Sequence, residues 1–227
     1  MSADIAALVL FDLDGTLVDS AVDLLNALNR ILEGEGKPAL PLARLRPVVS
    51  KGGRAMLAVA FPERDETGRE ALLQPFLDTY AAAVAEHSTP FDGIEDVLRT
   101  IESAGVRWGI VTNKPLYLAE RVVASMGWNG RCAVLLGGDS LPKKKPEPDQ
   151  LLSACEQLGV APGDCVYVGD DERDIVAARR AGMKSVAARW GYREAHENPD
   201  DWRPDAQAAW PRDLLSDGCL EAGIVLR

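Results

Sequence analysis

The chain has 227 residues, of which 47% are hydrophobic and 26% are charged. These values are typical of a folded globular protein and argue against a disordered chain. The formal net charge of −10 argues against general nucleic-acid binding, because that function needs a basic surface. No apolar run approaches the roughly 18 residues that cross a membrane, and we expect neither a membrane span nor a signal peptide.

The cysteines are scattered and form no CxxC pair, and only two histidines, His87 and His196, are present. A structural zinc site is therefore not expected, and both histidines are expected to be structural or exposed. Scattered thiols are typical of a reducing compartment, which predicts a cytoplasmic protein. The four cysteines are Cys132, Cys155, Cys165 and Cys219.

An apolar run at residues 6–11 predicts a β-strand that leads directly into Asp12, Asp14, Gly15 and Thr16. In an open α/β sheet a parallel strand delivers its C-terminal end to the ligand crevice. Two carboxylates two residues apart then project to the same side, and glycine lets the chain turn at once. A polar turn with an Asp cap is the alternative, but the apolar strand running into these residues favours a functional site. An EF-hand loop is excluded because the closing Glu is missing.

The pattern from about residue 21 to residue 86 is helical, with apolar residues at three- and four-residue spacing. We predict a small all-helical unit, at residues 20–87, inserted into a core formed by residues 1–19 and 88–227. Within this unit Gly52 and Gly53 permit close backbone approach, and Arg54 could meet an anionic or hydroxyl-rich group. A loop followed by a helix with a solvated Arg54 is an equal alternative.

The rest of the chain alternates short apolar runs with helical patterns, which predicts parallel strands joined by helical crossovers. A glycine between each helical pattern and the following run suits the end of a helix. The predicted strands cover residues 108–112, 133–136, 165–168 and 185–188, with a further short strand near residues 206–209. The glycines are Gly105, Gly127, Gly159 and Gly182.

The second predicted strand ends in Thr112 and Asn113, and Pro115 suits the first position of the helix that follows. Thr112 and the free amides of that helix start could hold a phosphate oxygen. An ordinary Thr or Asn helix cap explains these residues equally well.

A run of three lysines, residues 143–145, precedes Pro146 and Pro148. We expect two of the lysines to be solvated. The Pro-x-Pro sequence is expected to hold the chain extended into the next helix, so that Lys145 is presented rigidly to a phosphate partner.

A fourth strand runs straight into Asp170, Asp171 and Asp174. Acids also favour helix starts, and Asp171 could do no more than that. Asp12, Asp14 and Asp170 would nevertheless all lie at C-terminal strand ends, where carboxylates repel unless a hard cation joins them. Mg²⁺ is the natural candidate, and it would also resolve how an acidic protein binds an anionic substrate.

These four segments resemble the motifs of the haloacid dehalogenase superfamily, in order and along nearly the whole chain. The resemblance implies a Rossmann-like α/β sheet with an inserted helical cap, as in the phosphoglycolate phosphatase branch. It implies that Asp12 is a nucleophile that becomes an aspartyl-phosphate and that Asp14 is the general acid and base. It also implies Mg²⁺ at Asp12, Asp14 (through its carbonyl) and Asp170, and phosphate binding by Thr112, Asn113 and Lys145. Asp171 and Asp174 would support the site, Asp174 by orienting Lys145 or metal-bound water.

The acid at position 14 favours a phosphatase over a dehalogenase, because a halide leaving group needs no proton. A phosphosugar mutase and a catalytically idle partner-binding protein remain alternatives, whereas a receiver-like domain would lack the helical cap. The partner is expected to be a small phosphorylated metabolite, and the protein a monomer or a homodimer.

Several stretches resemble the N-acetylmuramic acid 6-phosphate phosphatases in particular, among them residues 52–56, 108–115 and 169–175. That resemblance implies peptidoglycan recycling as the first expectation, with 2-phosphoglycolate as the alternative substrate. Gly52, Gly53 and Arg54 would contribute to the choice.

Overall fold

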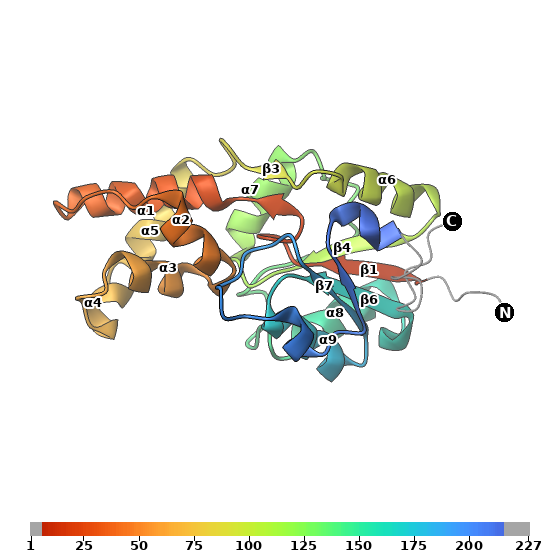
Figure 1. Cartoon of the computed structure of the whole chain (residues 1–227). Helices are drawn as coiled ribbons and strands as arrows, with labels where there is room; N and C mark the ends of the chain where they lie inside the picture. The colour runs from red at the N-terminus through yellow and green to blue at the C-terminus, as the bar shows by residue number, and fades with distance from the viewer. Residues whose placement is uncertain (1–5, 216–227) are drawn as a thin grey trace.

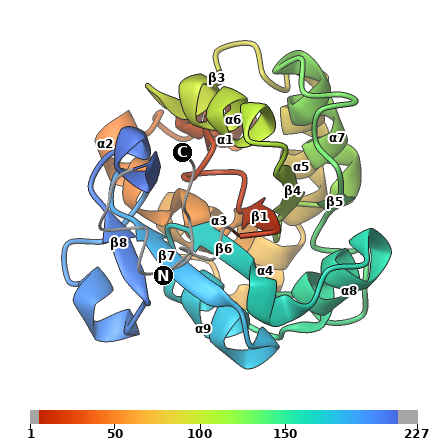
Figure 2. The ribbon, with the colours of Figure 1, turned by 90° about the vertical axis from the view of Figure 1, so that its right-hand side faces the viewer.

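The computed structural model describes residues 6–215 and contains a six-stranded parallel sheet in the order β5-β4-β1-β6-β7-β8 (Figures 1 and 2). The prediction of a Rossmann-like α/β sheet is therefore confirmed, and so is the short last strand. The strands are β1 (Leu8–Phe11), β4 (Arg107–Val111), β5 (Leu135–Leu136), β6 (Cys165–Gly169), β7 (Lys184–Ala188) and β8 (Ala206–Ala208). Residues 1–5 and 216–227, and with them Cys219, lie outside the described part.

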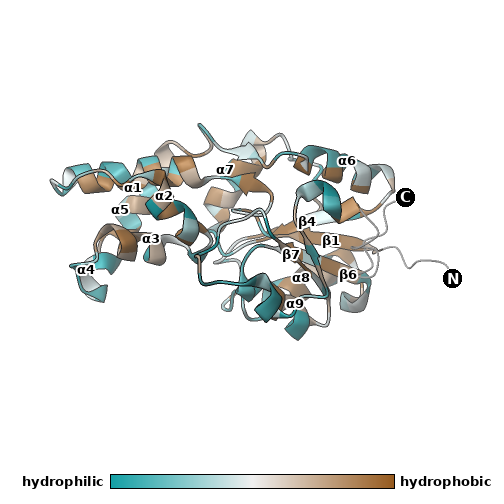
Figure 3. Ribbon diagram, in the orientation of Figure 1, coloured by the Kyte–Doolittle hydropathy of each residue, from teal (hydrophilic) through white to brown (hydrophobic). Residues whose placement is uncertain are grey.

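Alternating side chains of the strands bury the sheet on both faces, as the two-residue period of a strand requires. Val9 and Phe11 of β1 pack on one face with α6 (Ile94–Ser103) and α7 (Leu116–Ser125). Leu8 and Leu10 pack on the other face with α8 (Asp149–Leu158) and α9 (Glu172–Ala181). Figure 3 shows the resulting hydrophobic strands between helices whose outer faces are polar.

The register of the sheet brings three strand ends together. Phe11 pairs with Ile110 of β4 on one side and with Val168 of β6 on the other. Asp12, Thr112 and Asp170 therefore leave the sheet at one edge, as expected for parallel neighbours.

The chain between β2 (Val18–Asp19) and β3 (Thr89–Pro90) forms a helical unit that extends away from the sheet (Figure 1). These two short strands pair antiparallel, so the entry and the exit of the unit lie side by side. The helices bury a hydrophobic cluster of their own, to which Leu118 and Tyr192 also contribute. Its elements are α1 (Ala21–Gly34), α2 (Leu42–Leu45), η1 (Arg46–Lys51), α3 (Gly53–Ala60), α4 (Glu66–Glu70) and α5 (Leu73–Ala82). The domain limits at residues 20 and 87 stay a prediction.

The remaining elements are 3-10 turns: η2 (Pro162–Asp164), η3 (Pro199–Trp202) and η4 (Pro211–Leu215). No helix in residues 6–215 is both long enough and apolar enough to span a membrane. The predicted helix-terminating glycines Gly105, Gly127, Gly159 and Gly182 all adopt positive φ, the conformation that favours glycine after a helix.

Two local predictions were wrong. Pro115 is the residue before α7 rather than its first residue, because its ψ of 138° is extended. The Pro-x-Pro segment is a turn and not an extended strand: Glu147 N donates to Lys144 O at 3.0 Å, the Lys145–Pro146 bond is cis and Pro148 is helical. In each case the prolines fix φ, but ψ is set by the surrounding contacts.

Candidate active site

Three buried carboxylates from separate segments meet beyond the strand ends. Asp12 follows β1, Asp170 follows β6 and Asp174 lies in the first turn of α9. One ligand atom of each lies within 4.8 Å of the others. Asp12 and Asp170 therefore lie close together, as the sequence predicted. The third carboxylate of the cluster is that of Asp174 and not that of Asp14.

Mutual repulsion in this cluster changes the acidity of its members. Burial, and then the charges of Asp12 and Asp174, raise the pKa of Asp170 well above its ordinary value. Burial also raises the pKa of Asp174 to about 6, although Lys145 opposes the rise. Charged carboxylates this close are unfavourable unless a cation compensates them.

The donor set fits a hard divalent cation. Asp12 Oδ1 is buried, and apart from its ion pair with Lys145 it has no hydrogen-bond partner among the described residues. Asp170 offers carboxylate oxygens beside it, and the carbonyl of Asp14 lies close by, 3.4 Å from the Ser50 hydroxyl that also contacts Asp170. Asp174 is a weaker candidate ligand, because Oδ1 pairs with Lys145 and Oδ2 accepts from the amide of Asp171.

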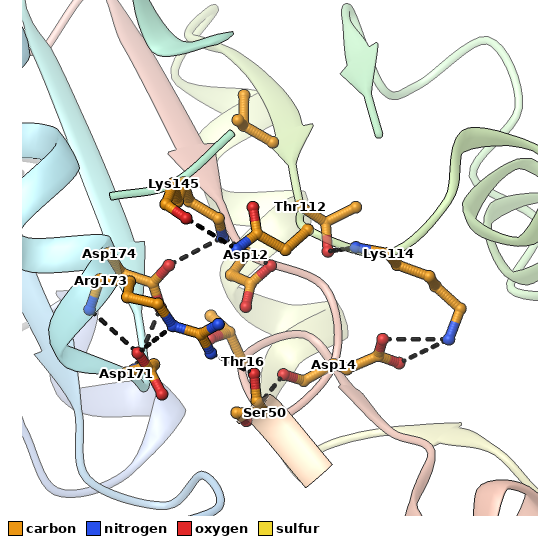
Figure 4. Close-up of polar contacts among 12 residues, drawn as sticks. Asp12, Asp14, Thr16, Ser50, Thr112, Lys114, Lys145, Asp171, Arg173 and Asp174 are labelled. Atoms are coloured by element: carbon orange, nitrogen blue, oxygen red, sulfur yellow. Dashed lines mark hydrogen bonds and ion pairs between the residues drawn. The ribbon is translucent and has the colours of Figure 1, made fainter. Parts of the chain in front are cut away.

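Lys145 is a buried cation at the site (Figure 4). Its Nζ lies 2.9 Å from Asp12 Oδ1 and 2.7 Å from Asp174 Oδ1, and it donates to Tyr167 Oη at 2.7 Å. Lys143 and Lys144 are exposed, as the sequence predicted for two of the three lysines. Lys145 therefore joins Asp12 to Asp174, an arrangement that agrees with the orienting role expected of Asp174.

The predicted phosphate-binding residues at the end of β4 line the same cavity as Asp12. Thr112 is buried, and its Oγ1 accepts from the amide of Lys114 at 3.3 Å. Asn113 points its Nδ2 at the carbonyl of Lys145, at 3.0 Å, and so links two loops of the site. The free helix amides expected next to Thr112 are not all free, because Leu116 N donates to Asp139 Oδ1 at 2.7 Å.

Asp14 turns away from the carboxylate cluster and toward Lys114, a residue to which the sequence assigned no role (Figure 4). Lys114 Nζ lies 3.0 and 3.2 Å from the two carboxylate oxygens of Asp14 and 3.0 Å from Tyr80 Oη. Its position directly after Asn113, at a strand end, was the only signal in the sequence.

The helical unit docks onto the core through Ser50 and Lys51, at the end of η1. The Ser50 hydroxyl donates to Asp170 Oδ2 at 2.7 Å, and Arg173 donates to the carbonyl of Ser50 at 2.5 Å. Lys51 pairs with Asp171 at 2.7 Å and also with Glu197. Sequence reasoning missed these contacts, because nothing in the local pattern of residues 46–51 indicates a partner.

Asp171 has two structural roles. Its side chain caps α9, with a reciprocal bond between Asp174 and the amide of Asp171, and it also receives Lys51. Burial tends to raise the pKa of Asp171, but Arg173 and Lys51 outweigh burial and lower it to about 2. The alternative prediction, that Asp171 caps the start of a helix, is therefore correct, but Asp171 also pairs with Lys51.

Comparison with known proteins identifies the family. The family model for haloacid dehalogenase-like hydrolases matches residues 9–188. The chain belongs to the haloacid dehalogenase-like hydrolase family. It is 54% identical to a phosphoglycolate phosphatase of Xanthomonas campestris, over 90% of this chain and 97% of that protein. It is 43% identical to an N-acetylmuramic acid 6-phosphate phosphatase of Pseudomonas aeruginosa, over 91% and 92% of the two chains.

A crystal structure from Haemophilus somnus, described as that of a predicted phosphoglycolate phosphatase, superimposes with a TM-score of 0.82 at 26% identity. It covers 92% of this chain and 96% of its own. These relatives confirm the prediction that this member of the haloacid dehalogenase-like family is an enzyme, and a phosphatase.

In this family member a cavity of about 320 Å³ opens from Asp12 and Asp14 toward the helical unit. Its polar end holds the site residues, and its apolar wall comes from α1, η1, α3, α5 and α7. The apolar residues are Leu24, Val49, Met56, Leu73, Phe76, Leu77 and Leu118.

The predicted specificity residues of the helical unit all line this cavity. Arg54, however, is largely exposed and pairs through two bonds with Glu70, at 2.6 and 2.7 Å. Gly52 has φ of +88°, and a Cβ at Gly53 would come within 2.8 Å of Leu73 Cδ1. The two glycines are thus needed for chain direction and for packing, and the role of Arg54 in binding stays a prediction.

Proposed function

We propose that this protein is a Mg²⁺-dependent phosphomonoester hydrolase in which Asp12 is the nucleophile. The observation that carries the proposal is the position of Asp12, which lines the cavity and lies beside the ammonium of Lys145 and the carboxylates of Asp170 and Asp174. An anionic phosphoryl group can approach a carboxylate only where positive charge compensates both, and Lys145 supplies part of that charge.

In the first step an oxygen of Asp12 forms a bond to phosphorus as the bond to the leaving oxygen breaks, and Asp14 gives that oxygen a proton. In the second step water attacks the aspartyl-phosphate, Asp14 accepts its proton, and Asp12 and inorganic phosphate are released. Lys145 and Thr112 neutralise and hold the phosphoryl oxygens throughout. Mg²⁺ bound by Asp12, Asp170 and the carbonyl of Asp14 would add positive charge beside the same oxygens.

We propose 2-phosphoglycolate as the first substrate to test. The four relatives that are 52–54% identical are all named phosphoglycolate phosphatases, whereas those named N-acetylmuramic acid 6-phosphate phosphatases are 43% and 41% identical. This reverses the order of preference drawn from the sequence, in which the amino-sugar phosphate stood first.

N-Acetylmuramic acid 6-phosphate, and with it a role in peptidoglycan recycling, remains a second candidate because of the cavity. A volume of about 320 Å³ with a long apolar wall exceeds what a two-carbon phosphate fills. We assign the choice between the two substrates to the helical unit, whose residues form most of that wall.

The test is a comparison of kcat/KM for 2-phosphoglycolate and N-acetylmuramic acid 6-phosphate at fixed Mg²⁺, with β-glucose 1-phosphate included to detect a mutase. A tenfold preference, about 1.4 kcal/mol of transition-state binding, decides between the two substrates. Asp12→Asn should lower kcat by more than about 10³-fold on either ester while circular dichroism stays unchanged. A wild-type enzyme that releases phosphate from no ester would refute the phosphatase proposal and favour a catalytically idle partner-binding protein.

A further inference from the structure

The contacts of Lys114 single it out among the cations of the cavity. It is a buried lysine between β4 and α7, and its ammonium contacts both carboxylate oxygens of Asp14. It contacts neither Asp12 nor Asp174 in the described structure, whereas Lys145 contacts both.

The two oxygens of Asp14 are not equivalent. Oδ1 accepts from the Ser20 hydroxyl at 2.6 Å and from Lys114 at 3.2 Å. Oδ2 accepts from Lys114 alone among the described residues, at 3.0 Å. A carboxyl protonated on Oδ2 can still accept two hydrogen bonds on Oδ1, so the side chain keeps its orientation in both protonation states.

The helical unit completes this arrangement. Tyr80, on α5, accepts from Lys114 Nζ at 3.0 Å, and its ring centroid lies 4.4 Å from the same atom. Tyr80 is almost fully buried. The placement of Lys114, and through it that of Asp14, therefore depends on a residue of the helical unit, 34 residues away in the sequence.

We propose that Lys114 is a positioning residue for proton transfer: it holds Asp14 with Oδ2 directed at the leaving oxygen of the substrate, and Tyr80 fixes Lys114 when the helical unit is docked. The inference rests on the proposed function, since it assigns proton transfer to Asp14. Asp14 passes one proton from Oδ2 to the leaving oxygen and regains one from the attacking water, and Lys114 neither gains nor loses a proton.

Esters with different leaving groups can distinguish a role of Lys114 in positioning the proton donor from a purely structural role. An alkoxide leaving group, as in 2-phosphoglycolate or glycerol phosphate, needs a proton as its bond to phosphorus breaks, whereas 4-nitrophenolate leaves as a stable anion. A residue that positions the proton donor should matter for the first class far more than for the second. Loss of folding, metal or phosphate binding should affect both classes alike.

The experiment measures kcat and KM of Lys114→Met, Tyr80→Phe and the exposed control Lys143→Met with the preferred alkyl phosphate and with 4-nitrophenyl phosphate. Lys114→Met should lower kcat on the alkyl ester by about 10²-fold and on the aryl ester by less than about tenfold, with KM little changed. Tyr80→Phe keeps the ring, so it should show the same selectivity with a smaller loss. Lys143→Met should match the wild type.

An equal loss of kcat on both esters, or a change in KM alone, would overturn the proposal. If Lys114→Met does not fold, Tyr80→Phe decides by the same comparison of the two esters. The phosphatase proposal fails on a different result, namely a wild-type enzyme that is inactive on every ester.

Discussion

The hydroxyl of Ser50 donates to Asp170 Oδ2 at 2.7 Å, although the two residues lie 120 positions apart. The bond joins the last turn of η1, in the helical unit, to a carboxylate at the end of β6. The next residue, Lys51, makes a second contact with the core, to Asp171. Docking of the helical unit and the geometry of the carboxylate cluster are therefore linked through two consecutive residues.

Lys51→Met tests this docking. The substitution keeps an apolar chain of similar length but removes the ion pairs with Asp171 and Glu197. Because a hydrogen bond between charged groups contributes about 1.5–3 kcal/mol, we expect kcat/KM to fall about tenfold or more. Lys37→Met is the matched control, since Lys37 pairs with Glu63 inside the helical unit. Equal activity of the two variants would show that the docked arrangement does not matter in turnover.

The carboxylate cluster predicts stabilisation by a divalent cation. At a Mg²⁺ concentration 100 times its dissociation constant the folded state should gain about 2.7 kcal/mol, which raises the melting temperature by several degrees. Differential scanning fluorimetry with Mg²⁺ and with EDTA measures the shift.

Asp170→Asn should abolish most of this shift, whereas Asp164→Asn, at an exposed position, should leave it intact. The Asn variant should also be at least as stable as the wild type in EDTA, because it removes one charge from a crowded buried cluster. A full Mg²⁺-dependent shift in Asp170→Asn would remove this residue from the metal site.

The sequence was sufficient to predict the sheet and the meeting of Asp12 with Asp170, because both depend on local signals. Apolar runs, a glycine after each helix and parallel strands together fix which residues leave the sheet at one edge. Asp12 and Asp170 follow strands that are direct neighbours, so no further information was needed.

The contacts of the helical unit could not be predicted in the same way. Lys114 with Tyr80, Lys51 with Asp171 and Ser50 with Asp170 are separated by 34, 120 and 120 residues. Each depends on how the unit sits on the core, which amphipathic spacing does not encode. The turn at Pro146 was missed for a related reason, since proline fixes φ and leaves ψ to the fold.

The contacts of Asp205, far from the active site, predict that the stability of the folded protein depends on pH. Burial tends to raise its pKa, but bonds from the amide and hydroxyl of Ser185 and from Lys184 lower it below its ordinary value of 3.8. A carboxyl with a lowered pKa stabilises the folded state above its unfolded pKa, and this stabilisation is lost as the pH falls through the folded value.

Asp205→Asn should therefore lower the free energy of unfolding by about 0.5 kcal/mol at pH 7, because solvent screens the interactions of this largely exposed carboxyl, and by less at pH 3. Urea unfolding of both proteins at the two pH values measures the difference. If the difference in free energy of unfolding between wild type and variant were the same at pH 3 as at pH 7, the contacts with Ser185 and Lys184 would not be what lowers the pKa of Asp205.

Gly191 offers a test of the metal site that changes no charge. A Cβ at this position would overlap the Asp170 carboxylate, whereas φ of Gly191 does not lie in the left-handed region that favours glycine. Gly191→Ala must therefore displace Asp170 or the loop whose next amide, Tyr192 N, donates to it at 2.9 Å. Changes next to a metal ligand typically cost 10- to 100-fold in affinity, and we expect a loss of about that size for Mg²⁺.

Titration calorimetry with Mg²⁺, on protein shown by circular dichroism to be folded, gives the affinity directly. Gly163→Ala is the matched control, because a Cβ there meets nothing within 4 Å, and its affinity should equal that of the wild type. The methyl group of Gly191→Ala and the Asp170 carboxylate cannot occupy their positions at the same time. If Gly191→Ala nevertheless bound Mg²⁺ as tightly as Gly163→Ala, Asp170 would not bind the metal from the position described here.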